Sequence, residues 1–167
     1  MAITVRTLLV AALLALGAPA WAAAPYGPNR AGETLKKSNS LAVKNSPETN
    51  TWTALCDMSV GGVDAGQSYS GVVLFQWYRP ESVGPATTVF DALFQVDPAH
   101  RTWTASAGIY KVTAKLIDRR VTIHAEVNFA TLNDEDMIFC DSRIDRDEAS
   151  GGIVTLFEAH MRAVVFP

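Results

Sequence analysis

Apolar and polar residues alternate with a period of two along most of the chain. Alternate residues of a β-strand share one face of the sheet, so this pattern predicts strands with one buried face. The clearest segment is 121–129, in which every second residue from Val121 to Phe129 is apolar. The segment 51–60 alternates in the same way and places Cys56 on its apolar face. We therefore expect a strand in each of these two segments.

Further strands are expected where β-branched, aromatic or alternating residues lie between turn residues. The run 69–78 is apolar on both faces, which is typical of a central strand. The segment 87–96 also alternates, but Val89 and Leu93 fit a helix as well, and a helix there would make the fold α+β. The other expected strands are 102–116, with a one-residue bulge near Gly108, then 137–144 and 153–166.

These segments amount to six to eight short strands with turn residues between them. Such spacing predicts an all-β fold, either an antiparallel β-sandwich or a closed barrel, as one domain over 51–167. Residues 23–50 are rich in Pro, Asn, Ser and Lys and have few aliphatic side chains. We expect them to form a flexible N-terminal arm, with at most a short edge strand over 41–44.

The first 22 residues have the features of a secretory signal peptide. Arg6 precedes the apolar run 8–16, and 20–22 reads Ala-Trp-Ala, which is typical of a cleavage site. The run is shorter than the roughly 20 residues that a membrane-spanning helix needs. We therefore expect an exported, soluble protein, periplasmic or extracellular, without stable membrane insertion.

The sequence contains two cysteines, Cys56 and Cys140. An even number of cysteines in an exported chain predicts a disulfide bond, here between two predicted strands.

The chain is slightly acidic, with a formal net charge of −3. Domains that bind nucleic acid are usually basic, so we expect no nucleic-acid partner. The sequence also has no G-x-S-x-G nucleophile motif and no Cys-x-x-Cys pair. The sequence therefore favours a protein without enzymatic activity and without a cofactor.

Two histidines lie two positions from a glutamate within predicted strands. These pairs are His124 with Glu126 and Glu158 with His160, and each pair shares one face of its strand. If the two strands are neighbours, the four side chains converge in a set that suits zinc or another divalent cation. This arrangement would support a small metal-dependent enzyme, whereas separate strands would leave two polar outer faces.

Two clusters are candidate contacts for a protein partner. Tyr78 and Arg79 end the aromatic run, and both residue types often anchor interfaces. Asp145, Asp147 and Glu148 belong to an expected acidic loop over 145–152. Our leading hypothesis is therefore an exported domain that binds another protein, and inhibition of an envelope or extracellular enzyme is one such role.

The general layout is similar to that of the chaperone–usher pilins, which are exported β-sandwiches with one disulfide and a flexible N-terminal arm. They also have a penultimate aromatic residue, which is Phe166 here. The resemblance implies an alternative function, as a subunit of a surface assembly that exchanges strands. The cysteines are farther apart than in that family, and the arm has no alternating donor segment.

Overall fold

The computed structural model describes residues 34–166, which form nine β-strands and no helix. The strands are β1 (Lys36–Ser46), β2 (Thr51–Gly61), β3 (Tyr69–Tyr78), β4 (Thr87–Val96), β5 (Thr102–Ala107), β6 (Tyr110–Ile117), β7 (Arg120–Phe129), β8 (Met137–Asp147) and β9 (Ile153–Val164). The expected signal peptide lies outside the described residues.

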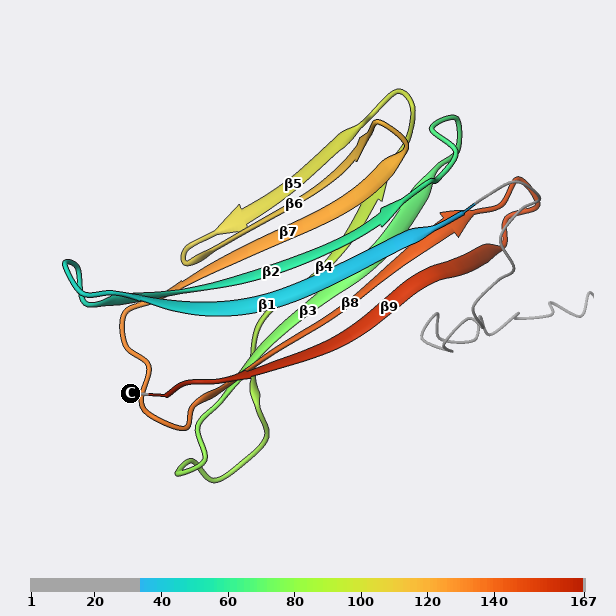
Figure 1. Cartoon of the computed structure of the whole chain (residues 1–167). Helices are drawn as coiled ribbons and strands as arrows, with labels where there is room; N and C mark the ends of the chain where they lie inside the picture. The colour runs from blue at the N-terminus through green and yellow to red at the C-terminus, as the bar shows by residue number, and fades with distance from the viewer. Residues whose placement is uncertain (1–33, 167) are drawn as a thin grey trace, which may run out of the picture.

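The strands form two antiparallel sheets that face each other (Figure 1). One sheet has the order β1-β2-β7-β6-β5, and the other has the order β4-β3-β8-β9. The apolar faces of both sheets pack together in a single core. The all-β prediction is confirmed, and of the two expected architectures the fold is the sandwich rather than the closed barrel.

Strand β1 lies within the segment that we expected to be a flexible arm. It pairs with β2 over eleven residues, in a register that places Leu41 opposite Cys56 and Val43 opposite Ala54. The edge strand expected over 41–44 is present but longer, and the prediction of a flexible arm is wrong for the rest of 36–46. Most side chains of β1 are exposed because the strand lies at a sheet edge, so its sequence carries little apolar alternation.

The segment 87–96 is strand β4, and the helical alternative is wrong. Its phase alternates as expected, with Phe90, Phe94 and Val96 buried in the core. Leu93 has the opposite phase and points out of the sheet, where 66% of its surface is exposed. The i, i+4 spacing of Val89 and Leu93 is therefore not a helical stripe.

The segment 102–116 is not one bulged strand but the hairpin of β5 and β6. Ala107 lies opposite Tyr110, so Gly108 and Ile109 form a two-residue turn, and Gly108 adopts a φ of 53°. A two-residue turn shifts the phase of the buried residues by one position, which is also the signature of a bulge. Strands β6 and β7 form the next hairpin.

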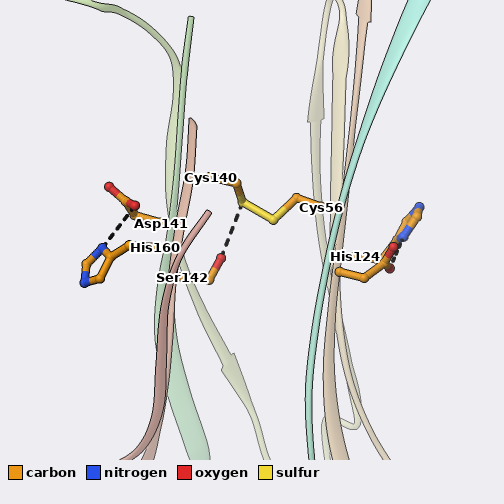
Figure 2. Close-up of a disulfide and its surroundings, with 7 residues drawn as sticks. Cys56, His124, Cys140, Asp141, Ser142 and His160 are labelled. Atoms are coloured by element: carbon orange, nitrogen blue, oxygen red, sulfur yellow. Dashed lines mark hydrogen bonds and ion pairs between the residues drawn. A yellow bond between two sulfur atoms is a disulfide. The ribbon is translucent and has the colours of Figure 1, made fainter. Parts of the chain in front are cut away.

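A disulfide joins the two sheets through the core. Cys56 on β2 and Cys140 on β8 are both fully buried and are 84 residues apart in sequence. Figure 2 shows the bond crossing from one sheet to the other. The predicted disulfide is confirmed.

Candidate functional site

The two histidine–glutamate pairs lie on different sheets. His124 is on β7 of the five-stranded sheet, and His160 is on β9 of the four-stranded sheet. Figure 2 shows the two imidazoles on opposite sides of the molecule, with the disulfide between them. Glu126 and Glu158 lie beside them on the same strands, so the four side chains do not converge, and the predicted metal site is wrong.

Each histidine instead contacts an aspartate on the neighbouring strand. His124 Nδ1 lies 2.7 Å from Asp57 Oδ1, and His160 Nδ1 lies 3.1 Å from Asp141 Oδ1. His160 Nε2 also lies 3.4 Å from a carboxylate oxygen of Glu158. Among residues 34–166, no three His, Cys, Asp or Glu side chains form a group that could hold a metal ion.

Arg79, a predicted contact residue, is partly exposed and is paired with the buried Asp136. Its Nε and Nη2 donate to the two carboxylate oxygens of Asp136, each at 3.0 Å. Its guanidinium also lies 4.9 Å from the centre of the Trp77 ring, a distance typical of a cation–π contact. Tyr78 is half-buried opposite Met137 of β8. Arg79 therefore anchors the chain and is not a free contact for a partner.

The Asp136 carboxylate is fully buried and needs these partners to remain charged. Burial raises the pKa of Asp136, but the hydrogen bonds from Arg79 and from the Asn133 amide outweigh it. The pKa of Asp136 therefore lies below its ordinary value. The hydrogen bond to Asp136 in turn raises the pKa of Arg79.

The Arg79–Asp136 pair holds three segments together. Arg79 begins the β3–β4 loop, and Asp136 ends the loop before β8. The Val165 amide donates to the Asp136 carbonyl at 2.8 Å, and the Glu135 amide donates to the Val165 carbonyl at 2.8 Å. This junction therefore fixes the C-terminal end of the described chain against both loops.

The acidic segment 145–152 is only partly a loop, because β8 continues to Asp147. Asp145 is 1% exposed and accepts hydrogen bonds from Arg143 Nε at 2.9 Å and Thr155 Oγ1 at 2.8 Å. Asp145 therefore serves the fold, and its prediction as a contact residue is wrong. Glu148 accepts a hydrogen bond from Arg146 Nε at 2.7 Å.

Asp147 is half-buried and borders a groove beside the edge strand β4. The groove consists of two adjoining hollows, of about 720 Å³ and about 280 Å³. We call it the β4 groove and define it by Ser70, Leu93, Phe94, Trp103, Asp147 and Ile153.

The β4 groove exposes large apolar side chains. Leu93 and Ile153 both line the smaller hollow and are 66% and 44% exposed. Phe94 is buried beneath this surface and Trp103 is half-buried, and the centres of their rings are 6.4 Å apart. Sequence reasoning missed this surface, although Leu93 carried a signal, since it is an apolar residue at a polar position of an alternating strand.

The larger hollow of the β4 groove carries negative charge. Asp147 accepts a hydrogen bond from Ser70 Oγ at 2.7 Å and is half-buried. Asp97 accepts backbone hydrogen bonds from His100 at 2.6 Å and Ala99 at 2.8 Å. The hydrogen bond from the His100 amide is the main cause that lowers the pKa of Asp97. Asp97 and Asp147 therefore place two acidic side chains beside an exposed apolar surface.

No family model matches the sequence, and no curated protein matches it either. Solved structures with a similar arrangement include a Northeast Structural Genomics Consortium target, SoR45, at 7% identity and a TM-score of 0.40. That similarity covers 80% of this chain and 87% of the other. A second is the "Putative ApaA Protein" from Bordetella pertussis, at 9% identity and a TM-score of 0.41, covering 80% of this chain and 94% of the other. Similarities this low say nothing about function.

The described residues contain no helix that is long and apolar enough to cross a membrane.

Proposed function

We propose that this chain is an exported, non-enzymatic domain that binds another protein through the β4 groove. The observation that carries the proposal is the exposure of Leu93 and Ile153 around one small hollow. Large apolar side chains that gather on a surface commonly mark an interaction site. The smaller hollow has a volume of about 280 Å³, which leaves room for an apolar side chain of a partner.

The partner would present an aliphatic side chain next to a basic residue. The aliphatic side chain would enter the smaller hollow between Leu93 and Ile153. The basic residue would face Asp97 and Asp147, which line the larger hollow. Opposite charges across an interface steer the encounter and orient the two partners.

The expected signal peptide and the disulfide support a partner outside the cytoplasm. Within this proposal, the domain inhibits an envelope or extracellular enzyme. A β-sandwich whose two sheets are joined by a disulfide can hold a binding surface in one shape. Such preorganisation reduces the entropy lost on association.

The test uses the mature protein and two double variants. Leu93→Ser/Ile153→Ser removes the apolar lining of the groove, whereas Ile109→Ser/Ile117→Ser removes two other exposed aliphatic side chains. Wild type and the second variant should capture the same protein from an envelope and culture-medium extract. That protein is then purified, and its affinity for all three forms is measured by calorimetry.

The proposal predicts that only the groove variant loses affinity, by about tenfold or more. Equal affinities of the groove variant and the wild type would place the interface elsewhere. If the purified protein binds no form of the domain, the proposed protein-binding function is wrong.

A further inference from the structure

A second hollow, of about 720 Å³, lies on the outer face of the five-stranded sheet. Its residues come from β1, β2, β6 and β7, none of which contributes to the β4 groove. We call this surface the hydroxyl face and define it by Ser38, Ser59, Thr122, Lys111, Lys115 and Arg120.

The hydroxyl face is hollow because short side chains meet at adjacent positions on neighbouring strands. Ser38 lies opposite Ser59, Ser59 lies opposite Thr122, and Thr122 lies opposite Lys115. The hydroxyls of Ser38 and Ser59 are 2.8 Å apart. Ser38, Ser59 and Thr122 thus form a row of short hydroxyl side chains across three strands. Lys115, on the fourth strand, ends this row with a long side chain.

Arg120 lies at the border of the same surface. Gly61 lies opposite Arg120, and a Cβ added at Gly61 would lie 3.5 Å from Arg120 Nε, an ordinary van der Waals distance. The guanidinium therefore lies close to Gly61, and Arg120 lines the same hollow as the three hydroxyls.

The hydroxyl face is basic although the whole chain is acidic. In the described range, 34–166, Lys111, Lys115 and Arg120 form no ion pair. Of the two carboxylates in the hollow, Asp57 is 2.7 Å from His124. The other, Glu126, accepts a hydrogen bond from Asn128 at 3.3 Å. Unpaired cations clustered on one surface attract anions.

We propose that the hydroxyl face binds an acidic oligosaccharide, independently of the protein partner proposed above. The hydroxyls of Ser38, Ser59 and Thr122 can donate to and accept from sugar hydroxyls. Lys115 and Arg120 can bind its carboxylate or sulfate groups through charge-assisted hydrogen bonds. The volume lies within the range of small-ligand pockets.

The lining also disfavours nucleic acid. The residues that line the hollow include no Phe, Tyr or Trp, whereas proteins that bind single strands usually stack bases on such rings. Hydroxyl and cationic donors suit a ligand that is polar on all sides and carries negative charge.

The experiment is an NMR titration of the mature protein with two acidic probes, a galacturonic acid tetramer and a heparin-derived tetrasaccharide. These probes distinguish carboxylated from sulfated ligands, and cellotetraose serves as the neutral control. We expect at least one acidic probe to shift the amide signals of β1, β2, β6 and β7 at millimolar concentration. Added salt should weaken the binding, because charge pairs near the surface are screened.

Two variants test the residues, and a third controls for net charge. Lys115→Ala/Arg120→Ala should weaken the binding by about tenfold or more, and Thr122→Val should weaken it without changing charge. Lys44→Ala/Arg162→Ala removes the same charge outside the hollow and should bind as the wild type does. The Thr122→Val variant decides the question if the double variant fails to fold.

Three results would overturn this proposal: no shift with either acidic probe, equal shifts with cellotetraose, or equal binding of a single-stranded DNA oligomer. None of them would affect the proposed protein partner, which is tested with different residues.

Discussion

The guanidinium of Arg79 binds both carboxylate oxygens of Asp136, each at 3.0 Å, although the two residues are 57 positions apart in the sequence. Asp136 is fully buried, so removal of Arg79 would leave a carboxylate without its main partner. We therefore predict that Arg79→Ala lowers the melting temperature by about 5–10 °C. Circular dichroism would measure this change.

Arg79→Lys is the matched control for charge. A lysine keeps the positive charge but cannot donate to both oxygens in the same planar geometry. The melting temperature of Arg79→Lys should therefore lie between those of the wild type and Arg79→Ala. If Arg79→Ala melts at the wild-type temperature, the junction does not contribute to stability.

The same pair predicts how stability depends on pH. The folded-state pKa of Asp136 lies below its ordinary value, so the unfolded chain binds a proton more readily. The contribution of ionised Asp136 to folding stability is fully present above the unfolded pKa of about 3.9. This contribution is lost as the pH falls through the lower pKa of the folded state. The gap in melting temperature between wild type and Arg79→Ala should therefore be constant above about pH 5 and narrow towards pH 2. A gap that widens in acid would contradict this sign.

The disulfide should contribute strongly to the free energy of unfolding. Cys56 and Cys140 close a loop with a sequence separation of 84, and the chain-entropy model gives about 3–5 kcal/mol for a loop of this size. Cys56→Ala/Cys140→Ala should lower the free energy measured by urea unfolding by this amount. A reductant should destabilise the wild type and leave the double variant unchanged.

Gly71 should tolerate no larger residue, because β8 and Phe94 pack directly against it. A Cβ at this position would lie 1.9 Å from the Arg143 carbonyl oxygen and 2.6 Å from the Phe94 ring. We predict that Gly71→Ala lowers the free energy of unfolding by about 2–4 kcal/mol. The control is Gly152→Ala, whose Cβ would meet its nearest atom at 3.9 Å, and this change should stay within about 0.5 kcal/mol.

Much of the fold could be predicted from the period-two pattern. The phase of 121–129 agrees with the burial of β7, in which Val121, Ala125 and Phe129 are all buried. The pattern failed where its physical basis is weak. Strand β1 exposes most of its side chains, and a two-residue turn at Gly108 gives the same phase shift as a bulge.

The site could be predicted much less well, because it depends on which strands are neighbours. His124 and His160 fit one metal site only if β7 and β9 are adjacent, and the two strands lie in different sheets. The sequence places Asp145 at the start of an acidic loop, whereas in the structure Asp145 lies in β8 next to a register shift and is buried. Leu93 was the one residue of the β4 groove whose own position carried a signal.

The β class, the phase of most strands and the pairing of Cys56 with Cys140 follow from the amino-acid sequence, because local alternation and cysteine number require no knowledge of neighbours. The order of the strands in space is needed to see that Arg79 is an anchor, that the histidines are apart and that Leu93 and Ile153 line one hollow. This difference arises because alternation records which face of a strand is buried. It does not record which strand lies beside it, and that order is set by packing of the whole core.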